Sequence, residues 1–477
     1  MIVHSPLSTV MGTEDRGPRT GDQTRLMQIN PGIFKAYDIR GLYPNEIDEA
    51  TARQIGRGFV SYLRASRIAV SRDMRVSSPA LAAAFIEGAR DQGASVVDYG
   101  MLPTDVLYYA VVTDNLEGGA QITASHNPKQ YNGIKMVRSE ALPLSGDAGI
   151  GDIRDMIAND RVPAPAATRG GLTSRDVLPG YVEKVMSFID PSIIKPFNVV
   201  LDAGSGMAGR VAPLLFERLP CRTTRLCFEV DGTFPNHEAN PLIEENRRDI
   251  TAEVVKQNAD IGIAWDGDAD RCFFIDGSGE FISGDFVTAL LAEAFLLKHP
   301  GATVIYNLRA SHAVRDTVAR HGGTALMNRV GHAFIKQRMR KEDGIFAGEV
   351  TGHYYFRDFY YADNGFIPAM LILELMSKKN QSLRELLQPY RERYFISGEI
   401  NTKLKSIEEV PKKLAAIETH FKDATLARLD GVSVDYPDWH FNVRGSNTEP
   451  LLRLNLEAKT PELMERKRDE VLEVIRG

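Results

Sequence analysis

The sequence is poor in cysteine and carries no large excess of charge of either sign. Its 477 residues include three cysteines, Cys221, Cys227 and Cys272, which are scattered and lack the spacing of a zinc site. This pattern favours a reduced compartment, and we expect a cytoplasmic protein. The formal net charge is −6, so the composition indicates neither nucleic-acid binding nor membrane association.

Long apolar runs are missing as well. The longest apolar helix candidate starts at Phe286, contains Glu293 and ends at Lys298, which makes it too short and too interrupted to span a bilayer. Residues 1–28 lack the apolar core of a secretory signal, and we predict a disordered N-terminal extension there. A chain of this length exceeds what one hydrophobic core supports, so several domains are expected.

Segments typical of strands and helices alternate from residue 68 onward. The first round contains "RIAVSRD" and "GGAQIT" as strands, with a helix between them that Ser78 is expected to cap. The pattern returns twice, whereas the last 85 or so residues read as strands and one closing helix. We predict an α/β protein with three similar α/β domains of mixed sheets and a C-terminal α+β domain. The predicted limits are 29–174, 175–280, 281–393 and 394–477.

Three aspartates follow a predicted buried strand in "WDGDADR". Asp266, Asp268 and Asp270 stand at alternate positions, where they repel one another unless a cation neutralises them. Oxygen ligands of this kind favour Mg²⁺ or Ca²⁺. The glycine and glutamate of an EF-hand are missing, because Arg271 and Gly277 occupy the sixth and twelfth positions. We predict a Mg²⁺ site that phosphate or water completes; a solvated acidic turn is the alternative.

Two further loops offer groups that suit a phosphorylated sugar. In "GEVTGHYYF", Glu349 and Thr351 supply an acceptor and a hydroxyl for a polyol, although such glycine-flanked pairs are also common in turns. The loop "RGSNTEP" combines a guanidinium, two hydroxyls and an amide, which suit a phosphate dianion, with a capped β-turn as the alternative. The residues concerned are Arg444, Ser446, Asn447 and Thr448.

The segment "QITASHNPKQYNGIKM" places Ser125 at the end of a predicted strand. The G-x-S-x-G elbow of many hydrolases is missing. Neighbouring strand residues point to opposite faces, so His126 is poorly placed as a base for Ser125. A phosphoserine would add a charge of about −1.5 to −2. A cation held by the aspartates would balance this charge, and Lys135 could stabilise the transferred group.

These loops together resemble a known family. "TASHNPKQYNGIKM", "DGDADR", "GEVTGH" and "RGSNTEP" stand in the order and spacing of the α-D-phosphohexomutases, and the resemblance extends from about Phe34 to the C-terminus. "FKAYDIRG" is similar to the N-terminal signature of that family. Within the family, "GEVTGHYYFRDFYYADNG" and "SNTEPLLRLNLEA" most resemble the bacterial phosphomannomutases. The resemblance implies four domains around a central cleft, each of which contributes one loop.

The resemblance also implies a role for each candidate residue. Ser125 would be the phosphoserine, and the metal ligands would be Ser125, Asp266, Asp268 and Asp270. The catalytic group would comprise Ser125, His126, Lys135, Arg271 and His353. Tyr37 and Arg40 would line the catalytic loop, and the substrate-binding set would comprise Tyr37, Arg40, Arg309, His332, Glu349, Thr351, Arg444, Ser446, Asn447 and Thr448. Thr351 replaces the usual serine and Arg309 a frequent lysine, which leaves the sugar preference open.

The implied reaction moves a phosphate reversibly between O6 and O1 of mannose, and of glucose as well, through hexose 1,6-bisphosphate. Expected partners are a hexose phosphate and Mg²⁺, with no nucleic acid and no membrane, in a monomer or a homodimer. His353 and Lys135 are both candidates for the general base. The alternatives are glucose phosphates as the main substrate, a Mg²⁺-dependent sugar phosphatase with an aspartate nucleophile, and a non-catalytic sugar-phosphate sensor.

Overall fold

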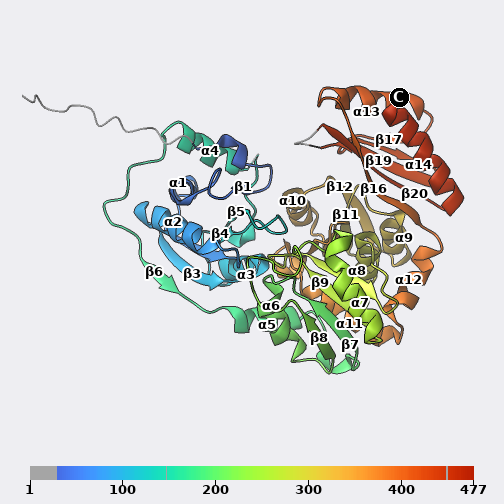
Figure 1. Ribbon diagram of the computed structural model, residues 1–477, viewed down its shortest axis with the longest axis horizontal. Helices are drawn as coiled ribbons and strands as arrows, with labels where there is room; N and C mark the ends of the chain where they lie inside the picture. The colour runs from blue at the N-terminus through green and yellow to red at the C-terminus, as the bar shows by residue number, and fades with distance from the viewer. Residues whose placement is uncertain (1–28, 147, 447–449) are drawn as a thin grey trace, which may run out of the picture.

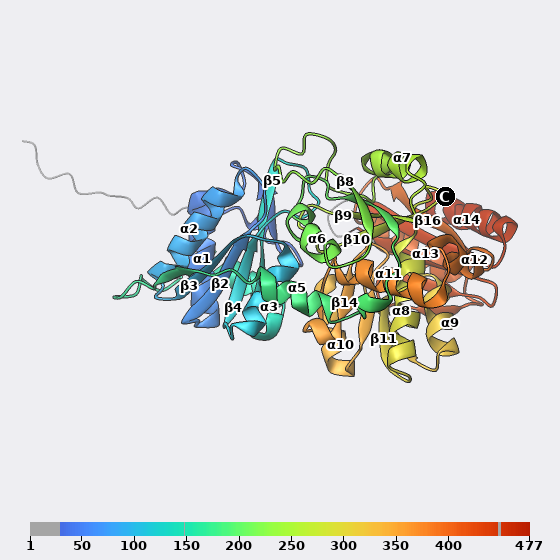
Figure 2. The same ribbon diagram turned by 90° about the horizontal axis from the view of Figure 1, so that it is seen from below.

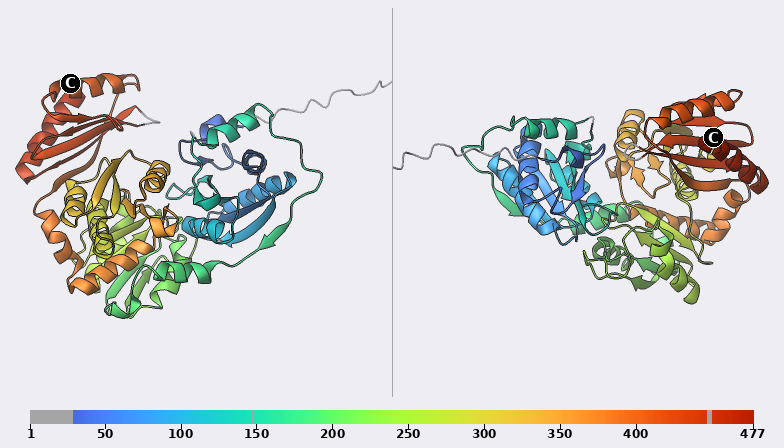
Figure 3. Two further views of the ribbon diagram at one scale, coloured as in Figure 1. Left: turned by 180° about the vertical axis from the view of Figure 1, so that it is seen from behind. Right: turned by 45° about the horizontal axis from the view of Figure 1, so that its top comes forward.

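A computed structural model describes residues 29–477 except 147 and 447–449. The predicted extension 1–28 and the predicted phosphate ligands Asn447 and Thr448 lie outside the described residues. Four sheets follow one another along the chain, and the units built on them follow a curved path (Figure 1). The N-terminal and C-terminal units form the two ends of this path, as the view from behind also shows (Figure 3).

The first sheet has six strands in the order β1-β5-β4-β2-β3-β6. Its elements are β1 Ile39–Leu42, α1 Glu49–Leu63, β2 Arg67–Arg72, α2 Ser78–Asp91, β3 Ser95–Met101, α3 Thr104–Thr113, β4 Gly118–Ile122, β5 Tyr131–Arg138, α4 Ile150–Ala158 and β6 Leu172–Ser174. The pairs β4–β2, β2–β3 and β3–β6 are parallel, and the pairs with β5 are antiparallel. Helices α1 and α2 cover one face and α3 the other (Figure 2). The predicted cap shifts by one residue, because Ser77 occupies the cap position and Ser78 begins α2.

The second sheet has four strands in the order β10-β9-β7-β8, of which only β10 is antiparallel to its neighbour. Its elements are α5 Leu178–Met186, β7 Asn198–Asp202, α6 Ala208–Phe216, β8 Arg222–Leu226, α7 Arg248–Lys256, β9 Ile261–Trp265 and β10 Cys272–Asp276. Strand β8 ends at Leu226, since Cys227 has a positive φ of 52° that breaks the ladder.

The third sheet is mixed and the fourth is antiparallel throughout. The strands of the third sheet follow the order β12-β11-β13-β14-β15. Its unit contains α8 Gly284–Lys298, β11 Thr303–Asn307, α9 His312–Arg320, β12 Thr324–Asn328, α10 His332–Glu342, β13 Phe346–Gly348, β14 Tyr354–Phe356, β15 Ala362–Asp363, α11 Ile367–Lys379 and α12 Leu383–Arg391.

The strands of the fourth sheet follow the order β16-β20-β19-β18-β17. Its unit contains β16 Phe395–Lys403, α13 Glu409–His420, β17 Thr425–Ala427, β18 Val432–Asp435, β19 Trp439–Gly445, β20 Leu451–Ala458 and α14 Pro461–Arg476. Short 3-10 helices cover Pro31–Ile33, Ser139–Ala141, Pro191–Ile193, Glu244–Arg247 and Arg357–Phe359. The predicted fold class is confirmed.

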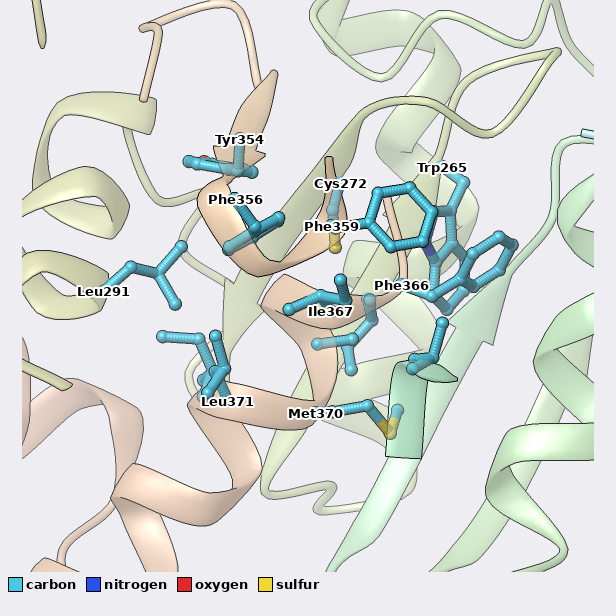
Figure 4. Close-up of a cluster of buried hydrophobic side chains, with 14 of the residues drawn as sticks. Trp265, Cys272, Leu291, Tyr354, Phe356, Phe359, Phe366, Ile367, Met370 and Leu371 are labelled. Atoms are coloured by element: carbon cyan, nitrogen blue, oxygen red, sulfur yellow. The ribbon is translucent and has the colours of Figure 1, made fainter. Parts of the chain in front are cut away.

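One apolar core joins the second and third sheets. Figure 4 shows Trp265 of β9 beside Phe366 at the start of α11, and the indole Nε1 donates to the Gly365 carbonyl at 2.7 Å. Helix α8 belongs to the same core and is buried on nearly all sides, which explains its long apolar sequence. Among the described residues, no helix is both long and apolar enough to cross a membrane. The C-terminal unit has a separate core, built from residues between 400 and 475.

Phe356 provides a test of this shared core. Its fully buried ring contacts Phe188, Phe295 and Phe346, so Phe356→Ala should leave a cavity and cost about 3–5 kcal/mol of unfolding free energy. Val76→Ala is the matched control, because Val76 is 75% exposed and its loss should change stability by at most about 0.5 kcal/mol. Denaturant unfolding followed by tryptophan fluorescence measures both. Equal stabilities of the two variants would contradict this assignment.

Candidate active site

The three predicted aspartates form one buried cluster after β9. Asp266, Asp268 and Asp270 are at most 1% exposed, and one oxygen from each lies within 4.8 Å of the others. The Oδ1 atoms of Asp268 and Asp270 are buried and find no hydrogen-bond donor among the described residues. Buried carboxylate oxygens of this kind are costly unless a cation or donor satisfies them. The cluster therefore fits a divalent cation that prefers oxygen ligands.

Lys135 of β5 compensates part of this negative charge. Its Nζ lies 2.7 Å from Asp268 Oδ2 and also contacts Asp270. Burial lowers the pKa of Lys135, but the two carboxylates outweigh it and raise this pKa above its usual range. Burial raises the pKa of Asp268, and Lys135 more than reverses that effect. Asp266 Oδ2 is 3.4 Å from Arg271 Nε, but burial and the two neighbouring carboxylates outweigh this charge and raise the pKa of Asp266 to about 7.

Ser125 lies in a tight turn and not on the strand that precedes it. Strand β4 ends at Ile122, and Ser125 has a φ of 52°. This turn directs the buried hydroxyl to the aspartates, where Oγ donates to Asp266 Oδ2 at 3.0 Å. The approach is close enough that a Cβ at Gly267 would lie 2.5 Å from the Ser125 carbonyl oxygen. Glycine is thus required at position 267 in this arrangement.

His126 lies on the same side as Ser125, contrary to the expectation from strand geometry. Its Nδ1 is 3.4 Å from Ser125 Oγ, because the left-handed turn removes the alternation of a strand. Arg271 Nη2 donates to the same Nδ1 at 2.8 Å, so the ring proton is on Nε2. Burial, followed by the charge of Arg271, holds the pKa of His126 well below its usual range. His126 is consequently neutral near pH 7.

Arg75 is a central residue that the sequence did not reveal. It is fully buried in the segment after β2, where Nε lies 3.2 Å from Asp73 Oδ2. Its two Nη atoms donate at 2.5–3.0 Å to four carbonyl oxygens of the serine loop, those of Ser125, Asn127, Pro128 and Tyr131. One guanidinium thus fixes the path of the whole loop. The available signal was the polar sequence "RDMR" at the carboxyl end of a strand.

The predicted sugar-binding loop, which contains Glu349 and Thr351, lies beside the metal loop, which contains Asp266, Asp268 and Asp270. The Cys272 amide donates to the Gly352 carbonyl at 3.1 Å, and Arg271 pairs with His353 through a backbone bridge. His353 Nδ1 lies 3.3 Å from Asp363 Oδ2 and 3.7 Å from Asp270 Oδ1. This imidazole therefore connects the two loops.

Glu349 and Thr351 differ in their surroundings. Glu349 is buried, and its Oε2 accepts a hydrogen bond from Tyr355 OH at 2.6 Å while Oε1 faces the Gly331 amide at 3.4 Å. Thr351 is half-buried and lines a large cavity. Tyr355 thus holds the Glu349 carboxylate in a fixed orientation.

Lys336 of α10 is a second charged residue that sequence reasoning missed. Its side chain is fully buried, with Nζ 2.7 Å from Asp363 Oδ1 and 4.3 Å from the ring centre of Tyr108. Burial lowers the pKa of Lys336, and Asp363 opposes this effect. A charged face of an ordinary helix would give the same sequence pattern, so no local signal marked this lysine.

The two residues of the N-terminal signature contact different parts of the site. Arg40 Nη1 donates to Asn127 Oδ1 at 2.6 Å and so lines the serine loop as expected. Tyr37 instead donates to the Val330 carbonyl at 3.3 Å, and its ring meets His332 edge-on with centroids 5.5 Å apart. The contacts of Tyr37 thus lie between β12 and the start of α10, and its expected place beside the serine loop stays a prediction.

Positive charge gathers where the third and fourth sheets meet. Arg444 of β19 lies directly opposite Arg453 of β20, although like charges in such pairs are destabilising. Glu399 accepts from Arg309 Nη1 at 2.8 Å and from Arg453 Nη1 at 3.2 Å. Burial and then Arg309 lower the pKa of Arg444. The guanidinium groups of Arg309, Arg444 and Arg453 outnumber the carboxylate of Glu399, and this excess of positive charge suits an anion. Ser446, which directly follows β19, is buried.

A cavity of about 770 Å³ connects these groups. Its lining includes His126 and Arg271 from the serine and metal loops, Thr351 from the predicted sugar loop, and Arg309 and Arg453 from the positive cluster. The volume is typical of a site for a small ligand. The arrangement can therefore receive one anionic molecule between His126 and Arg271 at one end and Arg309 and Arg453 at the other.

Comparison with known families gives matches to four successive parts of the chain. Residues 31–162, 179–279 and 283–394 match "Phosphoglucomutase/phosphomannomutase, alpha/beta/alpha" domains I, II and III, and residues 399–474 match the C-terminal domain of the same group. Together these matches cover most of the chain.

Individual relatives extend this likeness over nearly the full length. A protein of Xanthomonas campestris named "Phosphohexose mutases" is 43% identical over 452 residues, or 93% of this chain and 99% of the relative. A "Phosphomannomutase" of Salmonella montevideo is 42% identical over 455 residues, or 94% and 99% of the two chains. A crystal structure of a phosphoglucomutase/phosphomannomutase family protein from Burkholderia thailandensis has a TM-score of 0.86 at 33% identity, covering 94% of this chain and 98% of its own.

Arg75→Lys tests whether one guanidinium holds the serine loop. A lysine cannot serve four carbonyls, and each lost hydrogen bond from a charged group costs about 1.5–3 kcal/mol. We therefore expect faster amide hydrogen exchange across residues 123–132, measured by mass spectrometry. Arg53→Lys, at a largely exposed ion pair with Asp91, is the control and should leave this exchange unchanged. Identical exchange in both variants would show that other contacts hold the loop.

Proposed function

The chain belongs to the phosphoglucomutase/phosphomannomutase family, and on that basis we propose that it interconverts mannose 6-phosphate and mannose 1-phosphate. It is a phosphohexomutase, an enzyme of intramolecular phosphoryl transfer. Several relatives that match over nearly their full length are named phosphomannomutase, which favours mannose phosphates over glucose phosphates as the main substrate. Glucose phosphates are secondary substrates in this proposal, and the enzyme acts in the cytoplasm.

One observation carries the proposed mechanism. Ser125 Oγ donates to Asp266 Oδ2 at 3.0 Å, in a loop where three carboxylates converge. A phosphoryl group on this hydroxyl would lie directly at the carboxylate cluster. The aspartates themselves are poorer nucleophiles, because Asp268 and Asp270 are engaged by Lys135. We therefore assign the phosphoryl carrier to Ser125.

The carboxylates of Asp266, Asp268 and Asp270, with an oxygen on Ser125, would hold Mg²⁺. When bound, this ion neutralises negative charge on the phosphoryl group. Arg271 contributes further positive charge, since its Nε lies 3.4 Å from Asp266 Oδ2 and its Nη2 contacts His126. Each of the four proposed domains, 29–174, 175–280, 281–393 and 394–477, supplies one loop to this site.

The proposed reaction consists of two transfers in opposite directions. In the first, the bond from phosphorus to Ser125 Oγ breaks and a bond to a sugar hydroxyl oxygen forms; the hydroxyl proton passes to a base, and Ser125 Oγ takes up a proton. The product is a hexose 1,6-bisphosphate, which then turns end for end. In the second transfer the bond from the other phosphate to its sugar oxygen breaks and a bond to Ser125 Oγ forms; the serine proton passes to a base, and the freed sugar oxygen regains a proton. Positioning and charge neutralisation supply most of the catalysis.

The structure favours His353 over Lys135 as the general base. Two carboxylates hold Lys135 as an ammonium ion, whose raised pKa makes it a poor proton acceptor. His353 Nδ1 lies 3.3 Å from Asp363 Oδ2 and 3.7 Å from Asp270 Oδ1, and these carboxylates would stabilise the imidazolium that forms. Lys336 in turn holds Asp363 in place. Lys135 would then neutralise charge instead of accepting protons.

The phosphate that does not react is proposed to bind at the cluster of Arg309, Arg444 and Arg453. We call this proposed site the phosphate clamp; it would comprise Arg309, Arg444, Ser446, Asn447 and Thr448, to which we add Arg453. The sugar would contact Tyr37, Arg40, His332, Glu349 and Thr351. A clamp rich in donors accepts a phosphate in either orientation of the intermediate, as the reaction requires.

Intact mass spectrometry of the freshly purified protein tests the phosphoserine. We expect a phosphate-sized adduct on Ser125 that decreases when mannose 6-phosphate and Mg²⁺ are added. Ser125→Ala should lack both the adduct and activity. Ser205→Ala is the matched control, because Ser205 is also buried with a φ of 55°, and it should keep both.

Three outcomes would contradict this assignment. Full activity of Ser125→Ala would exclude the serine as carrier. Steady release of inorganic phosphate from mannose 6-phosphate, unaffected by Ser125→Ala, would instead indicate a phosphatase with an aspartate nucleophile. Binding of sugar phosphate without any turnover would indicate a sensor.

Arg453→Met tests whether Arg453 binds the phosphate, and the same assays test whether the enzyme prefers mannose 1-phosphate to glucose 1-phosphate. In the parent enzyme we expect a higher kcat/KM for mannose 1-phosphate than for glucose 1-phosphate. Arg453→Met should lower both values by the same factor, at least about tenfold, because a guanidinium–phosphate contact is worth about 1.5–3 kcal/mol. Arg428→Met is the control, as Arg428 is exposed on the same unit and pairs only with Glu418 among the described residues. Unequal losses for the two sugars would place Arg453 against the sugar ring.

A further inference from the structure

A second cluster of ligand-type side chains lies on the second sheet, outside the mutase site. Asp202 ends β7, Cys227 follows β8, and His237 stands in the loop that leads towards α7. His237 Nε2 lies 3.1 Å from Asp202 Oδ2 and 3.7 Å from Cys227 Sγ. One ligand atom from each residue lies within 4.8 Å of the other two. These residues are remote in sequence from the aspartates at 266–270.

The separations match those between ligands of a tetrahedral zinc ion. Zinc bonds of about 2.0 Å to nitrogen and oxygen and about 2.3 Å to sulfur place the nitrogen about 3.3 Å from the oxygen and about 3.5 Å from the sulfur. The corresponding distances from His237 Nε2 are 3.1 Å and 3.7 Å. The two separations from His237 are thus close to those between ligands of one shared ion, and Asp202 and Cys227 offer ligand atoms within 4.8 Å of each other.

The orientation of each ligand is fixed by a neighbouring backbone group. His237 Nδ1 lies 3.0 Å from the Glu238 carbonyl oxygen, which can only accept, so Nδ1 carries the proton and Nε2 points to the cluster. The Gly204 amide donates to Asp202 Oδ1 at 2.9 Å and leaves Oδ2 directed at the histidine. Such outer hydrogen bonds are the usual means by which proteins orient metal ligands.

We propose that Asp202, Cys227 and His237 bind a Zn²⁺ ion whose fourth position is taken by water. The sulfur and imidazole ligands select zinc over Mg²⁺, whereas the all-oxygen cluster of Asp266, Asp268 and Asp270 has the opposite preference. Binding releases the thiol proton of Cys227 and the Nε2 proton of His237 to solvent. The site is reachable, since the His237 side chain is 11% exposed and Cys227 is partly exposed.

The ion would fix residues 227–237, which pack against Arg75, the residue that holds the serine loop. This segment contains Gly232, where a Cβ would lie 2.6 Å from the Arg75 Cα, and Phe234, whose ring centre lies 5.4 Å from the Arg75 guanidinium carbon. The Asp231 amide also donates to the Ser205 carbonyl at 2.9 Å. The zinc ion is therefore structural in this proposal: it holds residues 227–237 against Arg75.

Cobalt substitution tests the site on the full-length protein. After treatment with chelator, the protein is titrated with Co²⁺ in excess Mg²⁺, and the thiolate-to-cobalt charge-transfer absorption in the near ultraviolet is recorded. This absorption appears only when a cysteine binds the metal. We expect it to saturate at one Co²⁺ per chain and to disappear when one equivalent of Zn²⁺ is added.

Variants identify the ligands. Cys227→Ser and His237→Gln should lose the absorption, while Cys221→Ser, at a half-buried cysteine away from any histidine contact in the described residues, should retain it. Circular dichroism verifies that each variant is folded. Zn²⁺ should also raise the melting temperature of the parent protein but not that of Cys227→Ser. No charge-transfer absorption in the parent, or its persistence in Cys227→Ser, would overturn the proposal and leave a hydrogen-bonded Asp202–His237 pair.

Discussion

Three carboxylates buried at one point are the constraint on which the arrangement of this molecule depends. Asp266, Asp268 and Asp270 lie almost entirely out of water, and buried charges are tolerated only when they are paired or coordinated. One positive group that meets them comes from a distant part of the sequence, and another stands beside them. Lys135 reaches them from β5 of the first sheet, and Arg271 follows Asp270 within the same loop. Lys135 thereby ties the first unit to the second at the aspartate cluster.

The third unit is connected to the same centre by a row of charged side chains. Lys336 of α10 contacts Asp363, Asp363 contacts His353, and His353 faces Asp270. Because these groups are buried, removal of one would leave its neighbour without a counter-charge. The proposed base is thus positioned by Asp363, which Lys336 in turn holds in place.

Local patterns were sufficient for the predictions that depend on neighbouring residues. The alternation of strands and helices followed from apolar periodicity, and the aspartate cluster followed from its place after a buried strand. Predictions failed where a distant partner or an unusual backbone decides the outcome. Arg75 contacts carbonyls 50 to 56 residues away, Lys336 contacts a later strand, and the turn at Ser125 depends on a left-handed φ that its sequence does not announce.

The separate core of the C-terminal unit has a consequence for the turning of the bisphosphate. Its apolar residues pack among themselves, while its contacts with the third sheet include the pair of Glu399 with Arg309 and the bond from the His312 amide to Glu457. Water can replace polar contacts of this kind, so a seam of this type separates at little cost. The cavity wall that the C-terminal unit supplies is therefore attached mainly through such polar contacts, and the proposed reorientation of the bisphosphate would need only this seam to open.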